Sequence, residues 1–394
     1  METSISISSL VAERERSAIF QTYERLPIGA VDHTEGCYIY TENGEKYLDL
    51  ISGLGVSALG HSHPKIVAAI TEQTSKYLHL SNLFLQEPQI TLAEKLKALS
   101  GFDKVFFCNS GTEAVEGALK LSRRYGASKG KFEILGLANA FHGRTFGPLS
   151  LMDNAKYRQD ISPLVEGMRC VSPEELSTTV SDKTAAIIIE VIQGEGGIRV
   201  ASEELIENLK RAKETFGCLI IADEIQSGIG RTGTFFAYEQ LGLKPDIVVA
   251  AKAIGGGLPL GAILTSDHIA SAFAPGTHGT TFGGNSLACA AGSVVLDEIQ
   301  NGLLESVSEL SEWFITELDL LKKQFPEKIK EIRGKGFMVG IDLTIDAKQV
   351  YQTLLKRNII TNVTAGTVLR LLPPLIITRV ELQKFLDLFS KILY

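Results

Sequence analysis

The fold follows from residues 218–261, CLIIADEIQSGIGRTGTFFAYEQLGLKPDIVVAAKAIGGGLPLG. This stretch holds two apolar runs that end in polar residues: CLIIA leads into Asp223 and Glu224, and IVVAA leads into Lys252. Apolar runs that are rich in β-branched residues and bounded by turn signals are typical of buried parallel strands. The carboxyl ends of such strands meet at one edge of an open α/β sheet, where ligands bind. We therefore expect an acid and a lysine to converge on one site.

Lys252 has the surroundings of a reactive amine, since no acid lies within five residues of it. Burial lowers the pKa of a lysine, and the neutral amine can form a Schiff base with a carbonyl. Gly255–Gly257 would let a bulky ligand approach. Pyridoxal phosphate also needs a carboxylate opposite its pyridinium nitrogen, which Asp223 could supply. A strand-end lysine that reaches solvent and a site for another anionic cofactor are the alternatives, and these residues alone leave them open.

Strand and helix patterns alternate from about residue 88 to residue 286. The alternation predicts a mostly parallel sheet that helices cover on both faces. In the helical stretch 201–216, the apolar residues Leu205, Leu209, Ala212 and Phe216 share one face. The predicted strands are KVFFCN (104–109), FEILGLAN (132–139), GMRCVS (167–172), AAIIIEVI (185–192), CLIIADE (218–224), DIVVAAK (246–252) and GAILT (261–265).

The two ends of the chain have a different character. GCYIYTENGEKYLDL (36–50) predicts a hairpin around Glu42-Asn43-Gly44. The C-terminal part predicts a smaller α+β unit, whose sheet the hairpin could join. Its expected elements are a long helix over 286–325, a strand in GKGFMVGIDL, a helix over 346–357, the short strands IIT and VLRLLPP, and a final helix. We expect an N-terminal segment over 1–60 that belongs partly to the small domain, a large domain over 61–286, and the rest of the small domain over 287–394.

Composition restricts the class of protein. Lys plus Arg is 39 and Asp plus Glu is 46, a net charge of −7, which does not attract nucleic acid or an anionic membrane. The five scattered cysteines are typical of reduced core residues in a cytosolic protein. The N-terminal residues lack a signal-peptide core, and no run of 18 apolar residues occurs. We expect a soluble cytoplasmic protein. His61 and His63 could suggest a metal, but without a third ligand a structural role is favoured, and we predict no metal.

Several turns after predicted strands carry groups that suit an anionic ligand. In CNSGTEA, Gly111 and Thr112 offer backbone amides and a hydroxyl at a helix N-terminus, which suits a phosphate. The alternative is a plain helix cap made by Ser110 or Thr112, and the residues leave both open. HGTTFGGN (278–285) is a second Thr/Gly turn able to bind phosphate.

Other polar residues also follow predicted strands. Phe141 could stack on a flat ring, and Arg144 could bind a carboxylate. His142 has no obvious partner, and we assign it no catalytic role. Glu190 and Glu195 could form an acid/base pair. Arg370 lies in an apolar strand, so its guanidinium needs an anion, either a ligand or an internal carboxylate, or each in turn.

The segments SGTEA, FHGRT, IQGEGG, ADEIQSGIGRTG, AAKAIGGGLPLG, THGTTFGGN and RLLPP, in this order, closely resemble the class III pyridoxal-phosphate aminotransferases. The resemblance covers nearly the whole chain and is nearest to the acetylornithine aminotransferases, with ornithine and 4-aminobutyrate aminotransferases as close relatives. It implies the aspartate-aminotransferase fold (pyridoxal-phosphate fold type I). That α/β fold has a large domain with a seven-stranded mostly parallel sheet and a smaller α+β domain from both chain ends.

The resemblance implies a role for each matching residue. Lys252 resembles the Schiff-base lysine that also moves the proton, and Asp223 the partner of the pyridine nitrogen. Arg370 resembles the arginine for the α-carboxylate of 2-oxoglutarate, Glu195 the glutamate that pairs with it in the other half-reaction, and Arg144 the arginine for the donor's α-carboxylate. Gln226 is expected at the phenolic oxygen, Phe141 on the ring, Gly111 and Thr112 at the phosphate with the partner subunit's Thr281, and Thr280 near the substrate. Ser110, His142, Glu190 and Ile225 complete the expected pyridoxal 5'-phosphate site.

Leu54 bears on the substrate. Ornithine aminotransferases resemble one another in having a tyrosine there that contacts the free α-amino group, so an apolar residue fits an N-acylated amine better. The resemblance therefore implies ω-amino transfer from N²-acetylornithine, or another N-acylated ornithine, to 2-oxoglutarate in arginine biosynthesis, by a homodimer with shared active sites. The alternatives are ornithine, 4-aminobutyrate or acylated-lysine transamination. A non-catalytic cofactor-binding regulator is disfavoured, because no DNA-binding appendage or basic patch is present.

Overall fold

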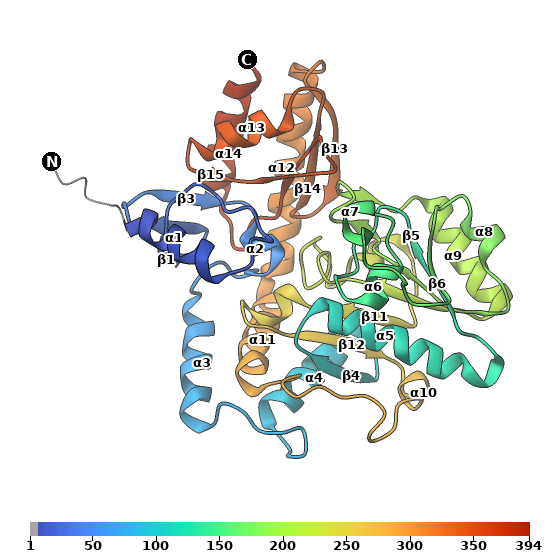
Figure 1. Ribbon diagram of the computed structural model, residues 1–394. Helices are drawn as coiled ribbons and strands as arrows, with labels where there is room; N and C mark the ends of the chain where they lie inside the picture. The colour runs from blue at the N-terminus through green and yellow to red at the C-terminus, as the bar shows by residue number, and fades with distance from the viewer. Residues whose placement is uncertain (1–6) are drawn as a thin grey trace.

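A seven-stranded sheet forms the centre of the larger part of the molecule (Figure 1). The computed structural model describes residues 7–394. The strand order is β4-β12-β11-β10-β7-β5-β6, and β12 runs antiparallel to both of its neighbours while the other pairings are parallel. All seven predicted strands are present, which confirms the mostly parallel sheet. They are β4 (Lys104–Cys108), β5 (Glu133–Leu137), β6 (Met168–Val171), β7 (Thr184–Ile189), β10 (Leu219–Asp223), β11 (Ile247–Ala250) and β12 (Gly261–Thr265).

The sheet has an apolar core on each face. Successive strand residues point to opposite faces. Ile187 and Ile220 accordingly belong to one buried cluster, whereas Ile188 and Ile221 belong to another. Helix α5 (Gly111–Gly126) covers the second cluster, and α9 (Glu203–Phe216) and α11 (Ser286–Glu298) pack on the first. The prediction that helices cover both faces is therefore confirmed, and the carboxyl ends of the strands are left as the open edge.

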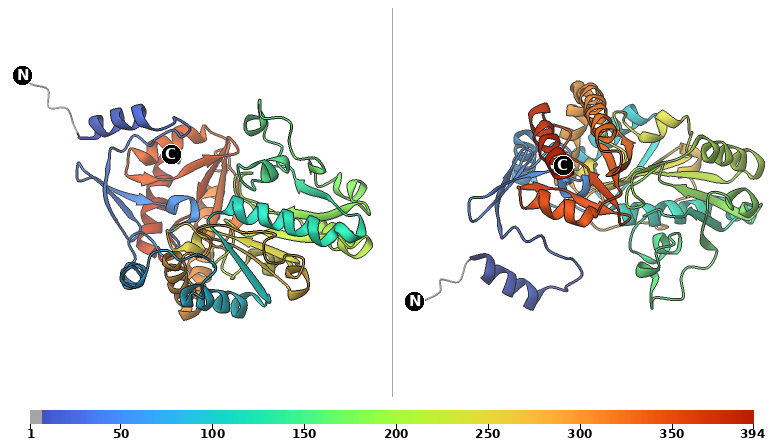
Figure 2. Two further views of the ribbon diagram at one scale, coloured as in Figure 1. Left: turned by 60° about the horizontal axis from the view of Figure 1, so that its bottom comes forward. Right: turned by 90° about the horizontal axis from the view of Figure 1, so that it is seen from above.

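The two ends of the chain lie side by side (Figures 1 and 2). The predicted hairpin is present as β2 (Tyr38–Thr41) and β3 (Lys46–Asp49), preceded by β1 (Val31–Glu35), which the sequence analysis missed. The hairpin meets the C-terminal part through β15 (Ile359–Ile360), which pairs in parallel with β3. These strands form a sheet of their own, β1-β2-β3-β15, separate from the sheet β13-β14-β17-β16. The latter contains β13 (Ile329–Lys335), β14 (Met338–Leu343), β16 (Asn362–Thr364) and β17 (Val368–Leu371).

Two predicted elements differ from the structure. The helix expected over 286–325 is broken between α11 and α12 (Leu304–Gln324) by a π turn in which Gly302 has φ +98°. The strand expected over 185–192 ends at Ile189, because the chain turns at Glu190. The next residues form a separate small hairpin, β8 (Ile192–Gln193) with β9 (Arg199–Val200), which carries Glu195 at its tip.

The remaining helices surround these sheets. Pro64 opens α3 as predicted, and the last helix buries Leu382, Phe385, Leu386, Phe389 and Leu393. These helices are α1 (Ile7–Ala18), α2 (Ser52–Gly55), α3 (Pro64–Lys76), α4 (Glu87–Ser100), α6 (Phe146–Ser150), α7 (Ala155–Arg158), α8 (Leu176–Thr179), α10 (Asp267–Ala270), α13 (Ala347–Leu355) and α14 (Arg379–Leu393).

Within residues 7–394, none of the helices combines the length and apolarity that spanning a membrane requires. Residues 1–6, the start of the N-terminal segment without a signal-peptide core, lie outside the described part. His61, which the sequence paired with His63, has its Nε2 atom 2.8 Å from Oδ2 of the buried Asp49.

Candidate active site

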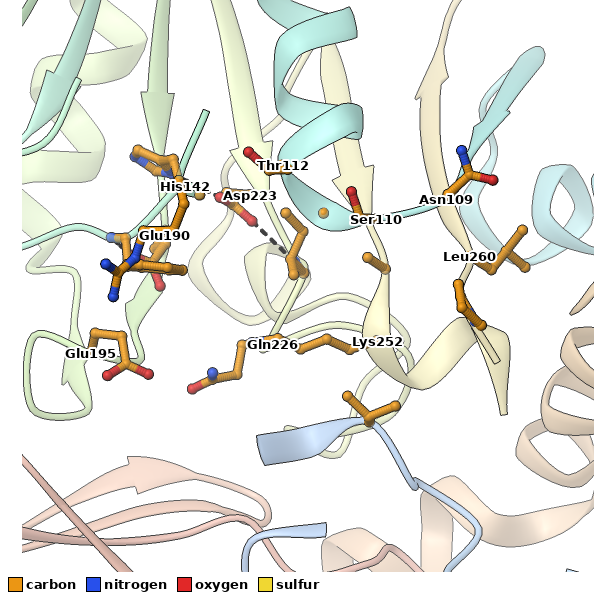
Figure 3. A pocket seen from close by; sticks show the side chains of 18 of the residues that line it. Asn109, Ser110, Thr112, His142, Glu190, Glu195, Asp223, Gln226, Lys252 and Leu260 are labelled. Carbon is orange, nitrogen blue, oxygen red and sulfur yellow. Dashed lines mark hydrogen bonds and ion pairs between the residues drawn. The ribbon is translucent and has the colours of Figure 1, made fainter. Parts of the chain in front are cut away.

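A cavity of about 460 Å³ opens at the carboxyl ends of β4, β5, β7, β10 and β11. Figure 3 shows Lys252, Asp223, Ser110 and Thr112 around this space, with Glu195 at its edge. The five strand ends bring together residues from five separate sequence segments, as the parallel sheet requires. The predicted site residues that line the cavity are Ser110, Gly111, Thr112, Phe141, His142, Arg144, Glu190, Glu195, Asp223, Ile225, Gln226 and Lys252.

Lys252 projects into the cavity from the turn that follows β11. Its φ of +50° is one that side chains other than glycine rarely adopt, so the surrounding fold holds the backbone in a strained conformation. Burial, together with the positive charge of Arg370, lowers the pKa of Lys252 to about 8. No hydrogen bond of its ammonium nitrogen occurs among the described residues. An amine that is partly neutral near physiological pH and has no partner is prepared to react with a carbonyl.

Asp223 ends β10 and is buried with His142. The His142 Nδ1 atom lies 2.7 Å from Asp223 Oδ2, and the backbone N–H of Ile225 donates to Asp223 Oδ1 at 3.1 Å. The sequence analysis found no partner for His142, and this contact corrects it. His142 Nε2 is buried without a partner among the described residues. The arrangement fixes the carboxylate at the end of the cavity and lets a neighbouring imidazole share or stabilise its charge.

Glu190 and Glu195 serve different parts of the site. Glu190 is buried and accepts hydrogen bonds from the backbone N–H groups of Phe141 (2.5 Å) and Gly194 (3.0 Å). Burial and the nearby Asp223 raise its pKa. Glu195 Oε1 instead lies 2.6 Å from Arg370 Nη1. The two glutamates therefore have separate partners here, rather than facing each other as an acid/base pair.

Helix α5 presents its N-terminus to the cavity. The Ser110 hydroxyl accepts from the N–H of Glu113 at 3.3 Å, so Ser110 is the helix cap. The N–H groups of Gly111 and Thr112, at the first two helical positions, have no intrahelical acceptor. The Thr112 and Thr145 hydroxyls are 2.8 Å apart. Ser110 thus accepts the hydrogen bond of the Glu113 amide, while the amides of Gly111 and Thr112 stay available to an anion.

Arg370 lies in β17 with 1% exposure and does not itself line the cavity, but it contacts the lining residues Glu195 and Gln226. Besides its ion pair with Glu195, its Nη1 donates to Gln226 Oε1 at 3.3 Å and its Nε to Asn362 Oδ1 at 3.1 Å. The internal ion pair that the sequence left open is therefore present. Because Glu195 belongs to the small β8–β9 hairpin, its release would free the guanidinium for another carboxylate.

Arg144 is exposed at another part of the cavity. Its guanidinium carbon lies 3.5 Å from the centre of the Tyr157 ring and 5.5 Å from that of Phe141. This stacking holds the planar cation without a carboxylate partner, which suits recognition of a substrate carboxylate. The sequence analysis missed Tyr157, which lies in the short helix α7 and does not follow a predicted strand.

The other predicted residues lie away from this cavity. Thr280 is linked to it through Asn109, whose Nδ2 donates to Thr280 Oγ1 at 2.9 Å, and Thr281 lines a separate surface depression. Leu54 is not among the lining residues, but Val56, two residues later, is. Leu54 belongs to α2, a turn in which Ser52, Gly53, Leu54 and Gly55 all have positive φ. Asn109 and Val56 are lining residues that the sequence analysis did not single out.

The site fits pyridoxal phosphate. Two free amides at the start of α5 suit its phosphate, the unpartnered amine of Lys252 its aldehyde, and the Asp223 carboxylate its pyridinium nitrogen. Replacing the hydrogen of Gly143 with a Cβ would place that atom 2.3 Å from Thr112 Oγ1, so a side chain at residue 143 would push into the start of α5, where the two free amides lie. The cavity volume is in the range of small-molecule sites.

Comparisons with known proteins agree with this geometry. A family model described as aminotransferase class-III matches residues 20–393. The chain is 43% identical over 381 residues to the acetylornithine aminotransferase of Aquifex aeolicus, covering 95% of this chain and 99% of that protein. It is 41% identical over 387 residues to the one from Methanocaldococcus jannaschii, covering 96% of each.

Solved structures give the same result. The ornithine aminotransferase of Toxoplasma gondii superposes with a TM-score of 0.91 at 27% identity, covering 99% of this chain and 96% of that chain. The acetylornithine aminotransferase of Elizabethkingia anophelis superposes with a TM-score of 0.86 at 33% identity, covering 98% of each.

Proposed function

Because the chain belongs to the class-III aminotransferase family, we propose that it transfers the ω-amino group of N²-acetylornithine, or of another N-acylated ornithine, to 2-oxoglutarate in arginine biosynthesis. The enzyme is an aminotransferase whose cofactor is pyridoxal phosphate. The observation that carries the proposal is the pair of arginines at the site of Lys252: Arg144 is exposed and stacked on Tyr157, and Arg370 is buried and paired with Glu195. Relatives named acetylornithine aminotransferase at 37–43% identity support the choice of donor.

The cofactor, when bound, supplies an aldehyde for the amino group and a ring that withdraws electrons from the reacting carbon. Asp223 would hold a proton on the ring nitrogen, and its contacts with His142 and Ile225 keep the carboxylate in place. The Lys252 amine, with its pKa lowered to about 8, would accept the proton from the substrate carbon and return it. The free amides at Gly111 and Thr112 would bind phosphate.

Two arginines suit the two substrates of an ω-aminotransferase. The donor reacts at its ω-amine, so its α-carboxylate lies far from the reacting carbon, where we place Arg144. 2-Oxoglutarate reacts at its α-carbon, so its α-carboxylate lies close, where we place Arg370. With the donor bound, Glu195 neutralises Arg370, because an unpaired buried guanidinium is costly.

We further propose a homodimer in which each subunit completes the other's site. Thr281, expected at a phosphate, does not reach the cavity of its own chain. The adjoining loop exposes Leu78, Leu83, Phe84 and Leu85, with Leu83 at 89% and Leu85 at 95% exposure. Asn82 in this loop donates to the Gly283 carbonyl at 3.1 Å, so the apolar loop and the Thr281 turn form one surface. A second copy of the chain would cover this apolar surface.

We also propose a cytoplasmic location. All five cysteines are free thiols, and four of them are buried. Reduced cysteines in the core are typical of proteins in a reducing compartment.

A panel of donors with 2-oxoglutarate tests the proposed reaction. N²-acetylornithine, N²-succinylornithine, ornithine, 4-aminobutyrate and Nα-acetyllysine are compared by glutamate formation. We expect an N-acylated ornithine to exceed ornithine and 4-aminobutyrate in kcat/KM by about tenfold to a hundredfold. Lys252→Ala serves as the inactive control. Highest kcat/KM with ornithine, 4-aminobutyrate or the acylated lysine would replace the proposed donor by that one.

A further inference from the structure

Arg231 is a buried cation that has no carboxylate partner among residues 7–394. It is 1% exposed and among the largest fully buried side chains of the described residues. Burial lowers its pKa to about 9, and no charged group contributes to that shift. Its partners are neutral: the carbonyls of Phe337 (3.4 Å) and Pro373, and the Ser52 hydroxyl (3.5 Å). Apolar side chains of similar size often stabilise a fold as well as a buried charge does. The presence of a guanidinium at this buried position therefore indicates a role that an apolar side chain could not fill.

Arg231 and its partners Phe337 and Ser52 come from three segments that are far apart in the sequence. Arg231 belongs to the loop after β10, Phe337 to the turn between β13 and β14, and Ser52 to the left-handed turn α2. The Arg231 backbone joins the same contact, because its carbonyl accepts from Phe337 N–H at 2.9 Å. A Cβ on Gly336 would meet the Thr232 backbone at 2.5 Å, so the two loops touch directly. The guanidinium thus connects the loop after β10 of the seven-stranded sheet to the α2 turn near the N-terminal hairpin and to the turn between β13 and β14 in the C-terminal part.

Pro373 lies three residues after Arg370, directly beyond the end of β17. The backbone there is held at consecutive residues: the Ser52 hydroxyl donates to the Leu372 carbonyl at 2.7 Å, and Arg231 Nη1 donates to the Pro373 carbonyl. The Leu372 N–H in turn donates to the Leu50 carbonyl at 2.7 Å. Ser52 and Arg231 therefore each donate a hydrogen bond that holds the backbone where β17 ends.

This anchorage bears on Arg370, whose partner must change during the reaction. When Glu195 leaves, Arg370 keeps only its contacts with Asn362 and Gln226, so its position depends on the backbone of β17. A planar guanidinium binds a carboxylate bidentately only when it is held in place. We propose that Arg231, with Ser52, is a positioning residue for the acceptor site: it holds the backbone after β17 so that Arg370 is ready for the α-carboxylate of 2-oxoglutarate. This inference rests on the acceptor role proposed for Arg370.

Binding of glutarate, a dicarboxylate without the reacting keto group, tests the inference by isothermal titration calorimetry of the cofactor-loaded enzyme. Arg231→Met keeps the approximate length of the side chain but removes its hydrogen-bond donors, and Ser52→Ala removes the hydroxyl that donates to the Leu372 carbonyl. We expect Arg231→Met to weaken glutarate binding and raise the KM for 2-oxoglutarate by about tenfold or more, with Ser52→Ala and Arg231→Lys showing smaller effects in the same direction. The donor half-reaction should change by less than about threefold, because Arg144 is anchored elsewhere.

Three outcomes are decisive. Unchanged glutarate affinity in Arg231→Met, or equal losses in both half-reactions, would overturn the positioning role. If Arg231→Met does not fold, Arg231→Lys and Ser52→Ala decide in the same way, since each keeps part of the contact. Arg370→Ala separates the two proposals: if it leaves glutarate binding intact, the acceptor site itself is misassigned. Arg211→Met, an exposed arginine on α9, is the matched control and should leave glutarate affinity unchanged.

Discussion

Lys252 combines a strained backbone with an amine that is easily deprotonated. Its pKa is lowered from 10.5 to about 8, so the neutral amine becomes the main species above about pH 8. Only the neutral form attacks the cofactor's aldehyde. Covalent loading of the apoprotein should therefore accelerate as pH rises and level off above about pH 8, as stopped-flow absorbance would record. Borohydride reduction followed by peptide mass spectrometry should locate the adduct on Lys252. A midpoint near that of an ordinary lysine, or an adduct on another lysine, would refute the assignment.

Asp223 is predicted to keep a charge opposite the ring nitrogen. Asp223→Asn should still bind the cofactor, but transamination should fall by about a hundredfold or more, the scale on which an electrostatic partner acts. The neighbouring Glu224 is the control. It accepts hydrogen bonds from Ser227, Ala237 and Tyr238 and does not line the cavity, so Glu224→Gln should lower the melting temperature more than the turnover of the folded protein. Near-normal turnover of Asp223→Asn would contradict the role.

Single residues could be predicted where a strand end exposes them. Asp223 and Lys252 follow apolar runs, and the sheet places both in the cavity. The partner of His142 could not be predicted, because it lies 81 residues away and short sequence patterns carry no information on such pairings. Tyr157 was missed for a similar reason, since its packing on Arg144 and Phe141 is a tertiary contact.

At the scale of elements, we propose that β17, which carries Arg370, and the β8–β9 hairpin, which carries Glu195, separate the two half-reactions. Arg370→Ala should slow the 2-oxoglutarate half-reaction by about a hundredfold, because it also leaves Glu195 unpaired. Arg144→Ala should slow mainly the donor half-reaction. Glu195→Ala should favour α-amino donors such as glutamate over the ω-amino donor. Absorbance changes of the bound cofactor follow each half-reaction separately. Equal losses in both half-reactions for both arginine variants would show that the division is wrong.

The start of α5 depends on close contact with the 141–145 segment. A Cβ at Gly143, where φ is +132°, would lie 2.3 Å from Thr112 Oγ1 and 2.6 Å from Thr112 Cβ. Gly143→Ala should therefore weaken cofactor binding by about tenfold or more, measured by titrating the apoprotein. Gly130→Ala is the matched control, because its φ is also positive (+69°) but nothing lies within 4 Å. If both variants bind cofactor equally well, the close contact between Gly143 and Thr112 does not contribute to cofactor binding.

Element positions were predictable where hydrophobic periodicity is strong, as in the seven central strands. The break between α11 and α12 was missed although Asn301-Gly302 is a turn signal, because apolar residues continue on both sides of it. β15 was expected only as a short strand, and its pairing with β3 is a tertiary contact that periodicity does not specify.

The whole molecule is expected to depend on its partner subunit. Leu85→Glu places a charge in the exposed apolar loop beside the Thr281 turn, so we expect it to dissociate the dimer and weaken cofactor binding in parallel. Sedimentation velocity and cofactor titration measure the two effects. Val380→Glu, at a position that is 75% exposed on α14, is the control and should change neither. A Leu85→Glu protein that stays dimeric, or a wild-type protein that is monomeric, would refute the shared site.

The parallel pairing of β3 with β15 has a consequence for how the protein is made. Translation delivers the β2–β3 hairpin long before its neighbour Ile359–Ile360, because the whole central sheet lies between them in the sequence. Until then the outer edge of β3 has unpaired backbone groups, and an open strand edge is a template for misassociation with other nascent chains. The central sheet can form earlier, since its last strand, β12, is complete at Thr265. The central sheet can therefore already be folded while the part of the molecule that carries Arg370 is still assembling around the earlier-made β2–β3 hairpin.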